Sequence, residues 1–327
     1  MEAASAKRRP AASAKRKPAA RLTDELLVEI LRRLPVRSVC RFKCVSRSWR
    51  NLISNPAHRK KLPQTLAGFF YRSWNWERFP RSARHFTNIT GKGRPFIVPS
   101  FSFLPVPSDN VTLLDSCNGL LLCRCFGAGD ASPPFHYVVC NPATKKWVML
   151  PDGSGEDRTA CLGFDPAVSS HFHVVEYVDD ERSAFLNGFM HMLTSDEDNG
   201  NHVVVMVDME GKTWRTIPVP TNIDNADASK LSIWILKDHA AHEWTPKHSV
   251  RIQFLFPEKD IEINMNWTLI TFHPECNLIY FVYGWDDTLI AYEMDRKEVR
   301  VIRKLGNECS GPYLPYVPLF TEALADG

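Results

Sequence analysis

Features that mark membrane-spanning, secreted and phosphate-binding proteins are missing from this sequence. No apolar run approaches the ~18 residues that cross a membrane, and the first residues lack the apolar stretch of a secretory signal. Neither the G-x-x-x-x-G-K-[ST] loop that cradles phosphate nor the G-x-S-x-G turn that carries a nucleophilic serine is present. We therefore expect a protein of the nucleus, the cytoplasm or both, without a membrane partner.

Histidine and cysteine are too sparse in any one place to predict a metal site or a catalytic centre. Cys40 and Cys44 could share one helix face, but a structural zinc ion needs about four ligands and His58 has no partner nearby. Cys123 and Cys125 alternate on an apolar stretch, as small buried side chains do. The odd count of nine cysteines, without an export signal, predicts reduced thiols. We expect no metal, no cofactor and no catalytic residue, and hence no enzymatic activity of the chain itself.

Positive charge is concentrated at the N-terminus, although the net charge of the chain is only +3. Residues 1–21 hold seven basic side chains against one acid, in the near repeats ASAKRRPA and ASAKRKPA. Such a segment cannot bury enough apolar surface to offset its ordering entropy, so we predict a disordered tail. It is a candidate nuclear-localisation signal carried by Lys7, Arg8, Arg9, Lys15, Arg16 and Lys17. A solvated tail without an address and an organelle transit peptide are the alternatives.

A helical pattern follows the tail in LTDELLVEILRRLP. Apolar residues recur at helical spacing and form one stripe, which consists of Leu26, Leu27, Ile30, Leu31 and Leu34. Thr23 is placed to cap the start of the helix, and Pro35 is expected to stop it. Arg32 and Arg33 would then lie in the last turn, where basic side chains interact favourably with the helix dipole.

The next stretch, VCRFKCVSRSWRNLISNP (39–56), predicts a second helical segment that is both basic and apolar. One face holds Val39, Phe42, Ser46, Trp49 and Ile53, and basic residues occupy the rest. A basic helix with an aromatic residue resembles a nucleic-acid reader, but Trp49 lies on the apolar face rather than among the charges. Some forty residues are too few to fold easily without help. We therefore expect a partner protein to cover the apolar surface of this module, and nucleic-acid binding is not expected.

Leu22 to Pro56 closely resembles the F-box, a three-helix motif that in its family docks onto a Skp-family adaptor. The adaptor in turn joins a cullin and a RING protein in a ubiquitin ligase. The resemblance implies an adaptor-binding surface made of Leu22, Leu26, Ile30, Leu31, Leu34, Pro35, Val45, Ser46 and Trp49, with Trp49 mainly in packing. Thr23 stands where the family usually has proline, so one rigid apolar contact is lost.

From residue 111 the pattern changes to short apolar runs that turn signals separate, which is typical of an all-β domain. Asn118-Gly119 and Asn187-Gly188 each lie between two apolar runs and predict hairpins. Each hairpin is followed by a strand, a turn and a strand with a tryptophan, Trp147 or Trp214. Units of four strands that repeat in this way point to a propeller or a similar ring of sheets. Core packing is the expected role of the two tryptophans.

This body resembles the F-box-associated, kelch-like domain of plant F-box proteins, in stretches such as LDSCNGLLLC, YVVCNPATKKWVMLP and LGFDPAVSSHFHVVEY. Short segments that the family has after VVEYVDDE and after TIPVP are missing, so we expect two or three absent strands. The predicted fold is an α+β multi-domain chain, with a three-helix F-box followed by an all-β, propeller-like domain. The predicted boundaries are a tail over 1–21, an F-box over 22–62, a linker with irregular strands over 63–109 and the β domain over 110–320.

Together these resemblances imply the substrate-recognition subunit of a Skp-cullin-F-box ubiquitin ligase, in which the β domain binds a protein target that the sequence does not name. Tryptophans on predicted loops are candidate target contacts: Trp74, Trp76, Trp234, Trp244 and Trp285. Two alternatives stay open. One is an adaptor-binding protein without a ligase role, and the other is a nuclear protein that binds nucleic acid or chromatin through its basic tail.

Overall fold

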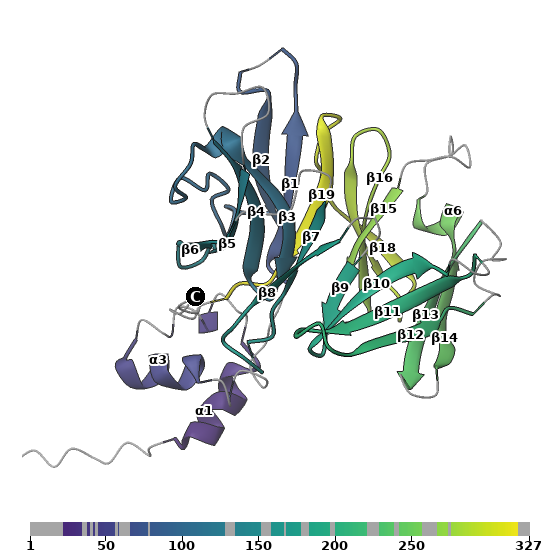
Figure 1. Cartoon of the computed structure of the whole chain (residues 1–327), viewed down its shortest axis with the longest axis horizontal. Helices are drawn as coiled ribbons and strands as arrows, with labels where there is room; N and C mark the ends of the chain where they lie inside the picture. Colours follow the sequence, from purple (N-terminus) through teal and green to yellow (C-terminus); the bar gives the residue numbers. More distant parts are fainter. Residues whose placement is uncertain are drawn as a thin grey trace, which may run out of the picture.

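The computed structural model describes two parts of the chain, a small helical module and a larger β domain (Figure 1). The described residues are 22–34, 38–39, 42, 45–55, 58, 66–77, 79–127, 135–151, 158–166, 168–177, 183–196, 200–220, 229–238, 242–256, 267–273 and 276–319. The basic tail and Pro35 lie outside them. The predictions for the tail and for Pro35 therefore stay predictions.

The helical module consists of residues 22–58 and has a small core of its own. Helix α1 (Asp24–Leu31) and helix α3 (Arg47–Ser54) are its two helices with described bounds. Their buried side chains meet between them, and the core is Val28, Leu31, Val39, Leu52 and Ile53. Since so few residues are fully buried, this module has little burial to stabilise it compared with the β domain.

The β domain contains 19 described strands in six antiparallel sheets. Three sheets have four strands: β3 (Val111–Cys117), β4 (Leu120–Phe126), β5 (Phe135–Asn141) and β6 (Lys146–Met149); β9 (Ser183–Leu186), β10 (Phe189–Ser195), β11 (His202–Asp208) and β12 (Trp214–Pro218); and β15 (Trp267–Phe272), β16 (Leu278–Tyr283), β17 (Thr288–Glu293) and β18 (Glu298–Lys304). One has three strands, β1 (Gly68–Trp74), β2 (Ser82–Asn88) and β19 (Cys309–Tyr316), and two have two strands, β7 (Thr159–Gly163) with β8 (His173–Tyr177) and β13 (Lys230–Asp238) with β14 (Glu243–Arg251). A short 3-10 helix, η1 (Ser108–Asn110), precedes β3, and helix α6 (Ile252–Leu255) follows β14.

The sheets are arranged like the blades of a propeller, as the repeat predicts (Figure 1). Contacts run from β19 to β3, from β3 to β7, from β7 to β9 and from β15 back to β19. Between β12 and β14, the indole N–H of Trp244 donates to the carbonyl of Pro218 at 3.0 Å. Ile233 of β13 packs in one core cluster with Ile279 and Phe281 of β16. Each sheet therefore contacts the next, and the last contacts the first.

The ring is closed by strands from the two ends of the domain. Strand β1 pairs with β2 on one side and with β19 on the other. Successive residues of β1 serve different cores, because strand side chains alternate between faces. Phe70 packs toward β3–β5, whereas Phe69 packs toward β16 and β17. The predicted linker over 63–109 is therefore wrong as a boundary: β1 and β2 are part of the β domain, and the irregular part among the described residues is the segment between β2 and η1.

The predicted turns and repeats are confirmed. Asn118-Gly119 and Asn187-Gly188 both have positive φ and join β3 to β4 and β9 to β10. The two units that start with these hairpins each form a four-stranded sheet. Among the described residues, two of the six sheets have two strands: β7–β8, just before one predicted gap, and β13–β14, just after the other.

The prediction that Trp147 and Trp214 pack in the core is wrong. Trp147 is 37% exposed and Trp214 is 63% exposed. Both residues lie on the last strand of their sheets, β6 and β12, which pair on one side only. The repeat predicted correctly that the two tryptophans occupy equivalent positions. Those positions are at the outer edge of a sheet rather than between sheets.

Candidate functional site

An exposed apolar row runs along α1 and the residues just before it. Leu22 is 51% exposed, Leu26 is 52% exposed and Ile30 is 45% exposed. Leu26 and Ile30 are four apart within α1, so they lie on one side of the helix. Leu22 precedes the N-cap Thr23 and extends the exposed apolar surface beyond the helix. The opposite side, with Val28 and Leu31, is buried in the module. The helix thus has two apolar sides, and the module covers only one of them.

Local capping interactions stabilise the start of α1, the helix that carries Leu26 and Ile30. The Thr23 hydroxyl accepts a hydrogen bond from the Leu26 amide at 3.4 Å, which confirms Thr23 as the N-cap. Asp24 is in the first turn, where its negative charge interacts favourably with the helix dipole. The helix ends at Leu31, earlier than the sequence predicts, so Arg32 and Arg33 lie after the last turn. There both arginines form ion pairs with Glu29, at 3.2 and 2.8 Å.

The structure corrects one member of the predicted adaptor surface. Leu31 is fully buried and packs with Leu52 and Ile53 of α3, so it supports the surface from below and does not belong to it. Leu34 is half-buried at the edge of the same core. The physical reason is that five apolar residues make a stripe too wide for one face, and α3 covers one half of it.

A break at Val45 and Ser46 separates α3 from the helical residues before it, so the segment from Val39 to Ile53 is not one helix. Ser46 is extended, with φ of −160° and ψ of 162°, and its hydroxyl accepts from the Trp49 amide at 3.2 Å. Val45 is 64% exposed at the break. The Trp49 ring lies 5.0 Å from the Phe42 ring, centroid to centroid, and packs against the core, as expected for a packing residue.

Loss of the Ser46 cap should loosen α3. We expect Ser46→Ala to lower the stability of the helical module by about 1 kcal/mol, because the Trp49 amide loses its acceptor. Hydrogen exchange of the α3 amides in the full chain measures this. Ser48→Ala is the matched control, since Ser48 is exposed inside α3 and alanine is the better helix former. Equal exchange in the two variants would contradict the capping role.

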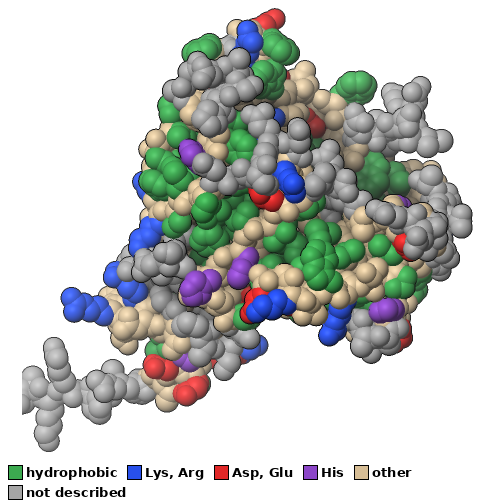
Figure 2. Space-filling view, in the orientation of Figure 1, with side chains coloured by type: hydrophobic (Ala, Val, Ile, Leu, Met, Phe, Trp, Pro, Cys, Tyr) green, Lys and Arg blue, Asp and Glu red, His purple; other side chains and the backbone are tan. Residues whose placement is uncertain are grey.

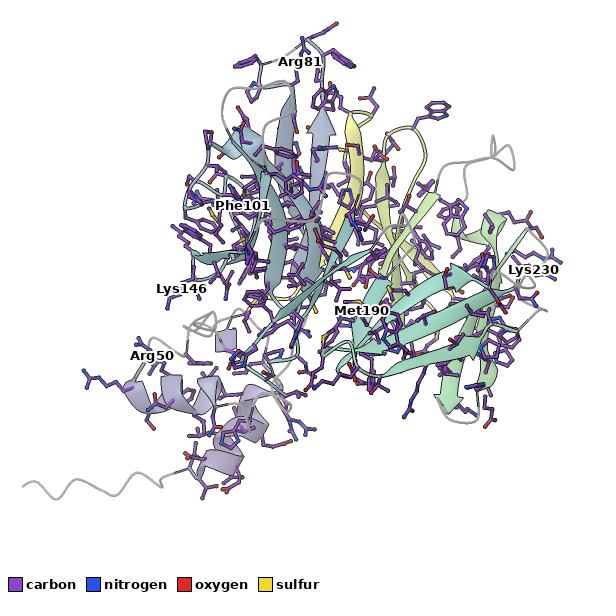
Figure 3. The ribbon with its side chains drawn as sticks, viewed as in Figure 1. Arg50, Arg81, Phe101, Lys146, Met190 and Lys230 are labelled. Carbon is purple, nitrogen blue, oxygen red and sulfur yellow. The ribbon has the colours of Figure 1, made fainter. Side chains whose placement is uncertain are left out.

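A second exposed group, mostly aromatic, lies at one end of the β domain, at the end of β1 and on the loops that follow β1 and β16. We call it the aromatic rim: Trp74, Trp76, Phe79, Arg81 and Trp285. Phe79 and Trp285 are 95% and 90% exposed. The rings of Trp74 and Trp76 meet edge to face at 5.7 Å, and the Arg81 guanidinium lies 5.1 Å from the Trp76 ring centroid. Arg81 lies at the opposite end of the molecule from Arg50 of α3 (Figure 3).

Three of the five loop tryptophans that the sequence suggests are thus exposed at this rim, and two are not. Trp234 and Trp244 are half-buried and lie within β13 and β14 rather than on loops. Phe79 and Arg81 were not predicted, although they sit in the same NWERFPR loop as Trp76. The spacing of aromatic residues in the sequence does not predict which loop residues remain exposed to solvent in the fold.

The remaining chemistry-bearing groups are buried or dispersed. Burial raises the pKa of the Cys117 and Cys125 thiols to about 12, so both stay protonated and unreactive near neutral pH. Among the described residues no group of three histidine, cysteine or acidic side chains could hold a metal ion. On the face shown in Figure 2, basic side chains are scattered among apolar and acidic ones. No helix of the described residues is long and apolar enough to cross a membrane.

Comparisons with known proteins match the helical module and the β domain. The F-box domain model matches residues 20–61, which contain α1 and α3. F-box protein At5g07610 of Arabidopsis thaliana is 29% identical over 209 residues, covering 61% of this chain and 46% of that protein. F-box protein At1g30790 of the same plant is 25% identical over 244 residues, covering 69% and 56%. The chain thus spans about half the length of these relatives.

Among solved structures, a nidogen/laminin complex is similar with a TM-score of 0.36 and 7% sequence identity, covering 76% of this chain and 97% of that chain.

Proposed function

The chain carries an F-box at its N-terminus and is related to plant F-box proteins, and from this premise we propose that it is the substrate-recognition subunit of a Skp-cullin-F-box ubiquitin ligase. In this role the helical module binds a Skp-family adaptor, and the β domain binds a protein that is to be ubiquitinated. The chain would supply no catalytic group. Its contribution would be proximity, because it raises the effective concentration of target lysines near the enzyme that carries activated ubiquitin.

One observation carries the proposal: the apolar row Leu22, Leu26 and Ile30 is half-exposed on a module whose other apolar side is buried. Burying a leucine or isoleucine side chain is worth about 1.5–3 kcal/mol, so covering this row would stabilise both the module and the complex. Val45 adds a further exposed apolar side chain at the start of α3. The polar residues beside the row, Asp24 and Arg33, would form the rim of the interface.

The placement of the aromatic rim fits the second half of the role. The rim lies on loops at the end of the β domain away from α1 and α3 (Figure 1, Figure 3). A target bound there would not compete with the adaptor for space. Exposed tryptophans and arginine are the side chains that most often carry binding energy at protein interfaces.

Reconstitution with purified components tests the proposal. We expect the full chain to form a stable complex with a Skp-family adaptor, to join a cullin and a RING protein through it, and to become ubiquitinated itself when the charged enzyme is added. Adaptor binding without any ubiquitin transfer would favour the alternative of an adaptor-binding protein without a ligase role. Failure to bind any Skp-family adaptor of the plant would overturn the proposal.

A further inference from the structure

Two arginines face each other near the rim, on the side of β1 and β2 that packs toward β3. Arg72 of β1 and Arg84 of β2 are direct cross-strand partners. Both are half-buried, and the Nε atom of each is buried without a hydrogen-bond partner among the described residues. Like charges directly opposite each other destabilise a strand pair. This arrangement therefore needs an explanation beyond packing.

Arg84 is held in place by the backbone. Its guanidinium donates to the carbonyl of Val111 at 2.7 Å and to the carbonyl of Ser108, and it lies 5.9 Å from the Phe101 ring centroid. Burial lowers the pKa of Arg84, although Asp109 attracts its charge. Carbonyl oxygens satisfy hydrogen bonds without cancelling the net positive charge. Arg84 is thus a fixed cation at the start of β3.

Arg72 has no comparable support. In the described part of the chain its side chain has no hydrogen bond and no ion pair, and neither arginine side chain is paired with a carboxylate. Of the acids on the packed elements, Asp109 is the one whose charge Arg84 senses. The Arg72 guanidinium thus has no protein acceptor among the described residues and lies across the strand pair from a second, fixed guanidinium.

A small cavity of about 20 Å³ opens between the sheets at this point. Its lining consists of the two arginines together with Tyr71, Val111, Thr112, Leu113 and Pro312. Such a volume holds about one water-sized group, so the tip of one side chain could enter it. Trp74 of the rim is two residues from Arg72 on the same strand, and alternate residues of a strand share a face. An aromatic surface and an unpaired cation are therefore adjacent at the same end of the domain.

We propose that Arg72 and Arg84 bind an anionic side chain of the target protein, a carboxylate or a phosphate, while apolar residues next to it contact Trp74. Guanidinium groups match both anions through charge-assisted hydrogen bonds. Binding would remove the repulsion between the two arginines, which gives the anion its affinity. The proposal names the substrate class of the rim and so rests on the proposed function.

Short peptides and inorganic phosphate test this in the full chain. The probes are a five-residue peptide with a central phosphoserine between leucines, its glutamate and serine counterparts, and inorganic phosphate. We expect the two anionic peptides to bind and the serine peptide not to bind. Arg72→Gln should weaken anionic binding at least tenfold without unfolding the chain, because the Arg72 side chain makes no hydrogen bond in the described structure. Arg215→Gln, an exposed arginine on β12, is the matched control and should bind as the wild type does.

Three results would overturn the proposal. The first is equal binding by Arg72→Gln and the wild type, and the second is equal binding of the serine and phosphoserine peptides. The third is a pair of results: inorganic phosphate binds as tightly as the peptides, and Trp74→Ala does not weaken peptide binding. The site would then bind a free anion rather than a side chain of a target protein. Adaptor binding by Arg72→Gln is measured in parallel. It should be unchanged, so failure at this site is distinguishable from failure of the ligase role.

Discussion

Leu26→Asp combined with Ile30→Asp should abolish binding of the full chain to a Skp-family adaptor, with a loss of at least a hundredfold in affinity. Both side chains are half-exposed in the free chain, so the substitutions leave the module folded. Asp at residue 26 even stands in the first turn of α1, where a negative charge is favourable. In the complex each carboxylate would be buried without a partner, which costs several kcal/mol, and about 1.4 kcal/mol is a factor of ten in affinity.

Val98→Asp combined with Leu193→Asp is the matched control for this measurement. Both residues are exposed and apolar, at 72% and 40%, and both lie in the β domain. The control should bind the adaptor with wild-type affinity in calorimetric titration. If Leu26→Asp/Ile30→Asp bound equally well, the row would not be the adaptor surface.

Phe70→Ala should lower the free energy of unfolding of the β domain by about 3–5 kcal/mol, as expected for a buried phenylalanine. Phe70 is fully buried, and its ring contacts come from three parts of the chain. The ring centroids of Phe86, Tyr316 and Phe101 lie 4.8, 5.3 and 5.7 Å away. Tyr316 is on β19, so the cavity that Phe70→Ala leaves would loosen the pairing of β1 with β19, which closes the ring.

Urea unfolding monitored by tryptophan fluorescence measures the effect. Phe254→Ala removes an equal volume from a side chain that is 54% exposed in α6, and it should change stability by less than about 1 kcal/mol. Similar losses in both variants would mean that the cluster around Phe70 does not close the domain.

Local signals in the sequence were sufficient for the helical module and the hairpins. Thr23 was identified as a cap because a hydroxyl before an apolar helical stripe satisfies the first free amides. The Asn-Gly turns were identified because a two-residue hairpin turn requires positive φ, which Asn118 and Asn187 adopt at 45° and 53°. In these cases the residues that determine the structure are neighbours in the chain.

Other features depend on contacts between distant residues, and the sequence pattern could not predict them. Gly119 and Gly188 occupy the same kind of turn, but only at Gly119 would a side chain collide with Leu319, near the end of the domain. The buried amide of Asn141 likewise donates to the Leu319 carbonyl at 2.8 Å. The pairing of β1 with β19 is of the same kind, and it moved the predicted start of the β domain.

The candidate sites show the same division. Helical spacing predicted the stripe with Leu26 and Ile30, and the family resemblance added Leu22. The burial of Leu31 depends on where α3 packs. The pair of Arg72 and Arg84 depends on the register between β1 and β2, which places them opposite each other across a loop. Neither arginine stands out in the sequence.

Site-specific photo-crosslinking tests the central claim most directly, which is that the adaptor covers the apolar row of α1. A photoreactive phenylalanine analogue is placed at residue 26 in one chain and at residue 193 in another, and each chain is irradiated with a Skp-family adaptor. We predict an adduct with the adaptor from residue 26 and none from residue 193. If the chain with the analogue at residue 26 bound the adaptor but gave no adduct on irradiation, the account would be contradicted.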